Sequence, residues 1–153
     1  MDSANIASAL TRMARERPHQ IAIFVPCGSD AAGRPAHTHL TYAQLDEESD
    51  AIACSLERNG ISRGVRTVLM VRPSLELFVL MYALFKAGAV PILVDPGISR
   101  TALKQCLAEA EPLAFIGIPL AHAARIALGW GRRTVKILVT VGSRFAWGGL
   151  SYA

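Results

Sequence analysis

Cysteine is scarce in this sequence. Cys27, Cys54 and Cys106 are odd in number, lie far apart and form no C-x-x-C pair. This argues against a disulfide framework and predicts reduced, buried thiols in a cytoplasmic protein. Long apolar runs are also missing, since the longest, from Leu77 to Phe85, falls well short of the roughly 20 residues that a membrane-spanning helix needs. The opening residues, MDSANIASAL, lack the basic and apolar regions of a secretion signal.

Motifs of common catalytic sites are absent as well. The sequence contains no G-x-S-x-G and no H-E-x-x-H. Residues 129–134, GWGRRT, resemble part of a phosphate loop, but they follow a predicted helix and lack the third glycine, so we reject this match. His37 and His39 alternate on a predicted strand and could offer two metal ligands, yet no third ligand lies nearby. We interpret them as part of an exposed strand face.

Two further side chains carry weaker hypotheses. Asp95 ends a predicted strand, where a carboxylate can accept phosphate, bind Mg²⁺ or hold a ribose hydroxyl, but it is better explained as the start of an Asp-Pro-Gly turn. His122 lies among alanines on a predicted helix, and we expect it to be a hydrogen-bonded, partly buried histidine rather than a base. The motifs alone therefore assign no catalytic, cofactor-binding or metal-binding residue.

The charge balance is mildly basic. The formal net charge is +4 over 153 residues, and 52% of the residues are hydrophobic, enough to build a core and to exclude compositional disorder. A local basic group could touch phosphate, but we interpret it as a solvated turn; its members are Arg125, Arg132, Arg133 and Lys136. No RNA-binding aromatic motif or helix-turn-helix pattern is present, so we expect no nucleic-acid partner.

The first 42 residues predict a helix and a strand pair. Within residues 1–19, apolar positions at helical spacing predict a helix over 3–16. Within residues 20–42, two strands at 20–26 and 37–42 flank a loop, GSDAAGRPA, rich in glycine, proline and small residues. Thr41 and Gln44 have the T-x-x-Q spacing of a capping box, which predicts that a helix begins directly after the second strand.

Residues 43–142 alternate between helices and strands. The strands lack polar alternation, which is typical of a parallel sheet covered by helices on both faces. Ser74 is a candidate N-cap, and Gly60 and Gly88 are candidate helix stops. We expect Val90 to Val94 to run through the sheet interior and residues 143–153 to form a tail of one α/β unit, residues 1–153. The predicted strands are 65–71, 90–95, 113–118 and 135–142, and the predicted helices after the first begin at 43, 74, 99 and 119.

Residues 39–96 resemble the opening of the large domain of adenylate-forming (AMP-binding) enzymes, such as acyl-CoA synthetases and peptide-synthetase adenylation domains. The segments that carry the resemblance are LTYAQL at 40–45 and LFKAGAVP at 84–91, continuing to Asp95 and Pro96. The resemblance implies an α/β fold, the N-terminal subdomain of an adenylate-forming large domain. It also implies that both segments are mainly scaffold.

A narrower resemblance is to the β-lactone synthetases of bacterial long-chain olefin biosynthesis. It rests on AFIGIPLAHAARIALGWGRR at 114–133 and on the WGG at 147–149. It implies that ATP, with Mg²⁺, activates a long-chain β-hydroxy acid as an acyl adenylate. The β-hydroxyl then attacks the activated carbonyl, expels AMP and closes a β-lactone.

The family's other functional segments are not found in these residues. The Ser/Thr/Gly-rich phosphate loop, the adenine-binding aromatic motif, the ribose-binding aspartate and the catalytic lysine of the C-terminal domain have no match. We therefore expect an N-terminal fragment that is inactive and binds no cofactor alone, partnered in the full enzyme by the rest of the large domain and the C-terminal domain. Other olefin-pathway enzymes are further candidate partners, and exposed sheet surface predicts self-association.

Two alternatives stay open at this point. A fatty acyl-CoA synthetase shares the first half-reaction, and the residues do not separate it from a lactone synthetase. A non-catalytic α/β interaction module is the second alternative, because the phosphate loop has no match.

Overall fold

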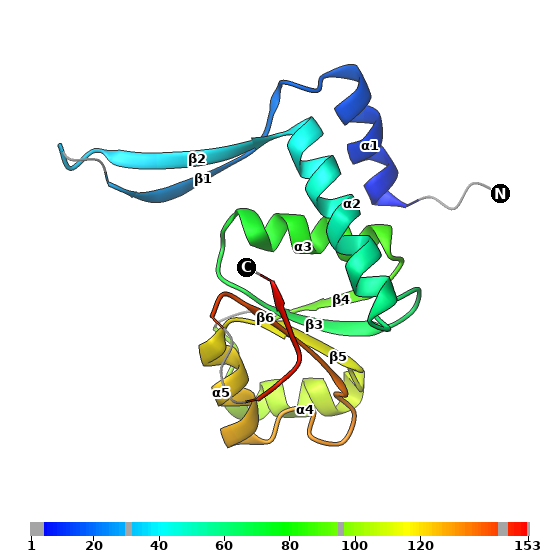
Figure 1. Cartoon of the computed structure of the whole chain (residues 1–153). Helices are drawn as coiled ribbons and strands as arrows, with labels where there is room; N and C mark the ends of the chain where they lie inside the picture. The colour runs from blue at the N-terminus through cyan, green and yellow to red at the C-terminus, as the bar shows by residue number, and fades with distance from the viewer. Residues whose placement is uncertain (1–4, 30–31, 95–96, 144–146, 153) are drawn as a thin grey trace.

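The computed structural model describes residues 5–29, 32–94, 97–143 and 147–152, and its helices and strands follow the predicted order with one addition (Figure 1). Asp95, a candidate site residue, lies outside the described residues. Within them the elements are α1 (Ile6–Glu16), β1 (Ile21–Ser29), β2 (Pro35–Thr41), α2 (Tyr42–Arg58), β3 (Arg66–Met70), α3 (Leu75–Lys86), β4 (Val90–Leu93), α4 (Arg100–Ala110), β5 (Ala114–Gly117), α5 (Pro119–Leu128), β6 (Ile137–Val141) and β7 (Leu150–Tyr152). No helix among these residues is both long and apolar enough to span a membrane.

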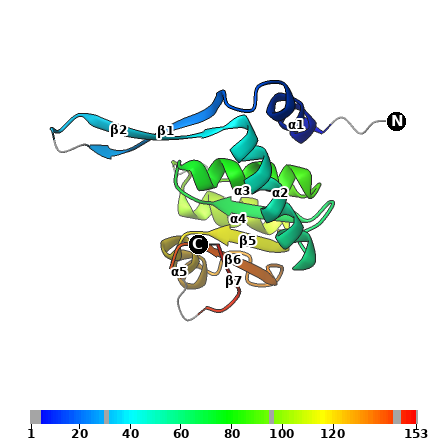
Figure 2. The same cartoon turned by 45° about the horizontal axis from the view of Figure 1, so that its top comes forward.

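Strands β1 and β2 form an antiparallel hairpin that projects away from the rest of the molecule (Figures 1 and 2). The pairing extends to Ser29 opposite Pro35, so both ends of the segment predicted as loop belong to the strands. This part of the prediction was wrong because glycine and proline are tolerated on an isolated two-stranded ribbon that has exposed edges. A register shift between Pro26 and Gly28 accommodates them.

The main sheet is entirely parallel, with strand order β4-β3-β5-β6-β7. Side chains alternate across it: Leu69 and Ile116 pack against α2 and α3, whereas Val68 and Phe115 pack against α4 and α5. Helices therefore cover both faces, as Figure 1 shows, and the predicted fold class is confirmed. A smaller apolar cluster joins α1, β2, α2 and α3 through Leu10, Leu40, Leu45 and Val79.

The residues predicted as a tail contain the strand β7. Leu150–Tyr152 pairs in parallel with β6, from Val139 opposite Leu150 to Val141 opposite Tyr152. Gly149 makes this approach possible, because a Cβ atom there would collide with the backbone carbonyl of Leu138. A strand of three residues is too short to produce a readable sequence pattern.

Strand β4 lies at the sheet's edge, which corrects the prediction that it runs through the interior. Val90 is 47% exposed and Leu93 is 60% exposed. Continuous apolar character predicted burial on both faces, but it carries no information about which strand ends the sheet. The outer side of β4 has no strand partner among the described residues.

The ends of the helices test the capping predictions. The capping box at Thr41 and Gln44 is present, with both reciprocal hydrogen bonds formed. Ser74 is the N-cap of α3, as predicted, although its side chain makes no capping hydrogen bond. Gly60 and Gly88 follow α2 and α3 with φ of 86° and 68°, the left-handed conformation that a helix stop requires.

Candidate functional site

The order of the strands reverses at β3. The chain moves from β3 outward to β4 through α3, and then back across β3 to β5 through α4 on the opposite face. In open parallel sheets, ligands bind outside the carboxyl ends of the strands at such a reversal, because the connecting segments diverge there and leave a crevice. The carboxyl ends of β3 and β5 are therefore where a site is expected.

A cleft of about 510 Å³ lies at this position, and we call it the switch-point cleft. The end of β3 and the segments that follow β3, β4 and β5 line it, together with residues from α4 and the turn after α5. Most of its wall is apolar, and two arginines, Arg72 and Arg100, are its charged residues. The apolar members are Leu69, Met70, Val71, Pro73, Val94, Ile98, Leu103, Ile118 and Trp130.

A smaller cleft of about 280 Å³ adjoins it, also at the carboxyl ends of the strands, and shares Arg72. Tyr152 of β7 and Glu76 of α3 also line it. Burial is the main cause that raises the pKa of the Tyr152 phenol, with smaller contributions from the negative charges of Glu48 and Glu76. The phenol is therefore a neutral hydrogen-bonding group at physiological pH rather than a base.

His122 lies beside this end of the sheet but is enclosed by the protein. The prediction that His122 is only partly buried was wrong. The residue is fully buried, because its ring packs between Phe115 and Trp147, with ring centroids 5.1 and 5.3 Å away. Its Nε2 lies 3.1 Å from the backbone oxygen of Val139, so the expected hydrogen bond is present. Burial lowers the pKa of His122, backbone contacts oppose this in part, and the Arg125 charge lowers the pKa further. The geometry is that of a neutral core residue.

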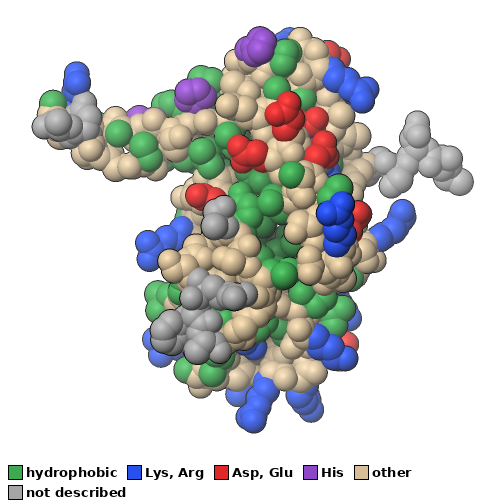
Figure 3. Space-filling model, viewed as in Figure 1, with side chains coloured by type: hydrophobic (Ala, Val, Ile, Leu, Met, Phe, Trp, Pro, Cys, Tyr) green, Lys and Arg blue, Asp and Glu red, His purple; other side chains and the backbone are tan. Residues whose placement is uncertain are grey.

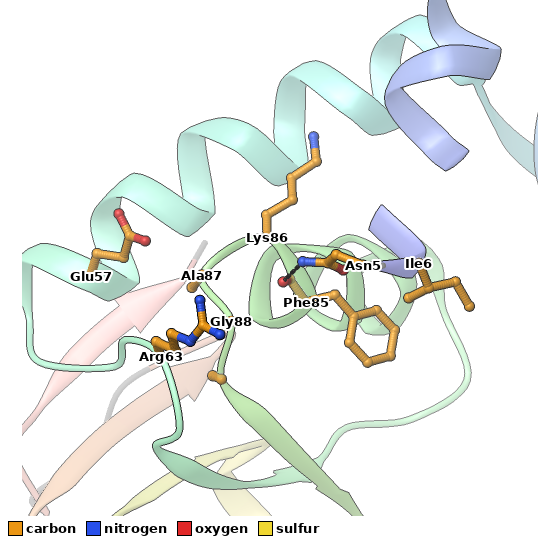
Figure 4. Close-up of a pocket in the computed structure, with 9 residues that line it drawn as sticks. Asn5, Ile6, Glu57, Arg63, Phe85, Lys86, Ala87 and Gly88 are labelled. Carbon is orange, nitrogen blue, oxygen red and sulfur yellow. Dashed lines mark hydrogen bonds between the residues drawn. The ribbon is translucent and has the colours of Figure 1, made fainter. Parts of the chain in front are cut away.

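The segment 84–91 lies where β4 begins, at the amino ends of the strands and therefore at the opposite end of the sheet from the switch-point cleft. It borders a cleft of about 620 Å³ with Asn5, Ile6, Glu57 and Arg63 (Figure 4). Lys86 also lines this cleft, and its side chain points toward α2. The Asn5 side-chain amide donates to the Phe85 carbonyl at 2.7 Å. This end of the sheet holds the amino ends of the strands, so the contacts are those of a scaffold.

The Nζ of Lys86 lies 2.6 Å from Asp46 Oδ1 and 2.7 Å from Asp50 Oδ1, and it also donates to the Asp46 carbonyl oxygen. Thr11 of α1 donates to the same Asp46 carboxylate. Since α1, α2 and α3 meet here, Lys86 joins three helices. These contacts account for the position without assigning it a catalytic role.

The remaining candidates stay apart. His37 and His39 are exposed, as predicted, and His37 stacks on Phe24 with ring centroids 4.5 Å apart. Among the described residues, no group of three or more His, Cys, Asp and Glu side chains could hold a metal ion. Gly129 and Gly131 both have positive φ and end α5, so GWGRRT forms a helix stop instead of a phosphate loop.

The basic group divides between two places. Arg132 and Arg133 are exposed in the turn before β6, as a solvated turn predicts, but Arg125 is half-buried, with its guanidinium 5.8 Å from the Phe115 ring centre. Basic side chains gather at the end of the molecule formed by α4 and α5, and acidic ones over α2 (Figure 3). The surface thus has separated charges and no continuous basic groove in this view.

All three cysteines are free and exposed, which corrects the prediction that they are buried. Cys27 lies on the projecting hairpin, and Cys54 and Cys106 lie on the outer sides of α2 and α4. Cysteine is usually buried, but Cys54 and Cys106 are exposed because the buried apolar stripes of α2 and α4 are formed by other residues.

A model of the family described as AMP-binding enzyme matches residues 10–147 of the chain. The chain belongs to the AMP-binding enzyme family. Over 150 residues, or 97% of this chain, it is 61% identical to an olefin β-lactone synthetase from Xanthomonas campestris, and it is 60% identical to one from Stenotrophomonas maltophilia. The chain spans 27% of the length of each of these curated relatives.

Two solved structures share the fold. Coronafacic acid ligase from Pectobacterium brasiliense superposes with a TM-score of 0.77 at 16% identity, covering 96% of this chain and 28% of that one. The apo structure of MbtA from Mycobacterium smegmatis gives 0.73 at 25% identity, covering 94% of this chain and 25% of that one. At 16% identity, the first of these shows the fold alone. The family resemblance predicted from the sequence is confirmed by the match to the family model.

Proposed function

We propose that this chain is the N-terminal part of an ATP-dependent enzyme that converts a long-chain β-hydroxy acid to a β-lactone through an acyl adenylate. The observation that carries the proposal is the 61% identity, over nearly the whole chain, to a protein described as an olefin β-lactone synthetase. A match to AMP-binding enzymes alone supports adenylate formation, and this higher identity favours the lactone product.

Two segments support the narrower assignment because they pack together. Phe115 and His122 belong to the FIGIP-x-AH segment, and Trp147 belongs to the WGG segment. The rings of His122 and Trp147 stack, and Trp147 Nε1 donates to Thr140 Oγ1 at 3.0 Å. Gly149 then lets β7 join the sheet. The sequence features that resemble lactone synthetases thus form one structural unit at the end of the chain.

In the proposed reaction, a carboxylate oxygen of the substrate attacks the α-phosphorus of ATP and pyrophosphate leaves. The β-hydroxyl oxygen then attacks the acyl carbon, loses its proton, and expels AMP as the four-membered ring closes. Ring closure within one molecule depends on a held geometry. We assign this chain the role of scaffold for that geometry, as residues 1–153 of the large domain, and no residue in it a catalytic role.

The described residues offer no fitting site for the Mg²⁺ that such chemistry uses, since no group of three or more His, Cys, Asp and Glu side chains among them could hold a metal ion. We therefore derive no step through the metal. We propose that the phosphate-binding and catalytic groups come from the remainder of the large domain and from a C-terminal domain. A cytoplasmic location stays a prediction, consistent with three free thiols.

Product analysis tests the proposal. The genomic reading frame is followed past residue 153, and a longer protein that it encodes is incubated with ATP and a long-chain β-hydroxy acid, with and without coenzyme A. Lactone formed without coenzyme A supports a lactone synthetase. A thioester formed only when coenzyme A is present identifies an acyl-CoA synthetase instead, and a frame that stops here supports the non-catalytic module.

A further inference from the structure

The switch-point cleft is mainly apolar, and its two charged residues have the same sign. Leu69, Leu103 and Trp130 are at most 6% exposed and supply its buried wall. Arg72 and Arg100 are exposed, and they come from different elements, Arg72 from the segment after β3 and Arg100 from the first turn of α4. An apolar cavity with a few polar groups is the usual form of a small-molecule site, and about 510 Å³ lies within the common size range.

The charge of these arginines is uncompensated within the described chain. Neither guanidinium takes part in an ion pair with a described carboxylate, whereas Arg66 and Lys86 do. Trp130 adds buried aromatic surface to the wall of the cleft.

We propose that the switch-point cleft binds a long-chain carboxylate, with the aliphatic chain along the apolar wall and the carboxylate on Arg72 and Arg100. The choice of a fatty carboxylate rests on the proposed function, while the cleft, its charge and its position at the strand reversal do not. A carboxylate matches the planar, donor-rich guanidinium groups. A nucleotide would match the arginines but leave most of the apolar wall uncovered.

Equilibrium dialysis of the 153-residue chain with radiolabelled decanoate tests this inference, with decanol as the uncharged probe. We expect one saturable decanoate site per chain and weaker binding of decanol. In the double variant Arg72→Gln/Arg100→Gln, the Kd for decanoate should rise on the order of tenfold, since each exposed ion pair contributes modestly. The Kd for decanol should stay within about twofold, because the apolar wall is unchanged.

The matched control is Arg132→Gln/Arg133→Gln, which removes the same charge from exposed positions at the opposite end of the sheet and should leave both Kd values unchanged. Arg100→Glu is a second variant that should fold well, because an acidic residue is favourable in the first turn of a helix, and it should raise the Kd for decanoate at least as much as the double variant, because it places a negative charge beside the bound carboxylate.

Absence of a saturable site, an unchanged decanoate Kd in the cleft variants, or equal weakening in the control would overturn the inference. So would displacement of decanoate by ATP, which would assign the cleft to the nucleotide. Because the assay needs neither ATP nor lactone formation, a chain that binds decanoate while the longer enzyme makes no lactone would remove the proposed function and leave this inference standing.

Discussion

Lys86 and Gly88 lie close together in the sequence but have different structural roles, an ion pair between helices and a helix stop. The Lys86 side chain is 10% exposed and its ammonium contacts Asp46, which is 15% exposed, so the pair is largely shielded from water. Gly88 then turns the chain into β4 with φ of 68°. Both features agree with the prediction that this segment is scaffold. Sequence spacing indicated the helix stop at Gly88, but it did not indicate the long-range pairing of Lys86 with α2.

Replacement of Gly88 by valine should lower the free energy of unfolding by about 1–3 kcal/mol, because a β-branched residue is strained at positive φ. The new Cβ would also lie 3.3 Å from Arg63 Cβ, a tight contact. Denaturant unfolding measures the change. Gly88→Asn is the matched control, since asparagine tolerates this conformation, and it should lose less. Equal unfolding midpoints for the valine variant and the unaltered chain would show that the junction does not need glycine.

At the scale of elements, apolar periodicity predicted every helix and every strand except β7. Helices and buried strands follow from local patterns, and the capping box at Thr41 is a local pattern as well. Three features could not be predicted because they depend on which elements become neighbours, and a single sequence carries no information about that. They are the exposure of β4, the exposure of the cysteines and the ring stack around His122. The switch-point cleft is of this kind, since Arg72 and Arg100 meet only after the strand order is known.

The packing of α5 against Trp147 should make stability depend on pH. Burial chiefly lowers the pKa of His122, so protons bind the unfolded chain more readily than the folded one. The stabilising effect of the neutral ring is present above the ordinary histidine pKa of 6.5, and it is lost progressively as pH falls below that value toward the folded-state pKa.

Urea unfolding from pH 7.5 to 4.5, with His122→Phe as the comparison, measures this dependence. Below pH 6.5 the free energy of unfolding of the unaltered chain should fall more steeply than that of the variant, by up to about 1.4 kcal/mol per pH unit. Parallel curves for the two proteins would mean that His122 ionises equally well in both states. A His39→Phe variant serves as control, because that ring is exposed.

At the scale of the whole molecule, apolar surface remains uncovered at the hairpin and at the edge of the sheet. Phe24 is 60% exposed on the projecting hairpin, and Leu93 is 60% exposed on β4. An edge strand with exposed apolar side chains is a template for association. The net charge of +4 opposes association only weakly at physiological salt.

We therefore expect the purified chain to self-associate or to bind a hydrophobic dye strongly. Light scattering should give an average mass that rises with concentration, and Leu93→Lys should reduce it, because a charge on an edge strand disfavours pairing. Leu120→Lys adds the same charge to an exposed position on α5 and should change the mass less. A monodisperse monomer with little dye binding would instead identify a self-sufficient domain and favour the non-catalytic module.

We propose that this chain provides part of an adenylate-forming scaffold and no catalytic residue. ATP–pyrophosphate exchange with a β-hydroxy acid tests it most directly, measured on the purified chain and on a chimera in which these residues replace their counterpart in the Xanthomonas campestris β-lactone synthetase. We predict no exchange above background from the chain alone and clear exchange from the chimera. Exchange by the chain alone, or a folded chimera that has none, would contradict the account.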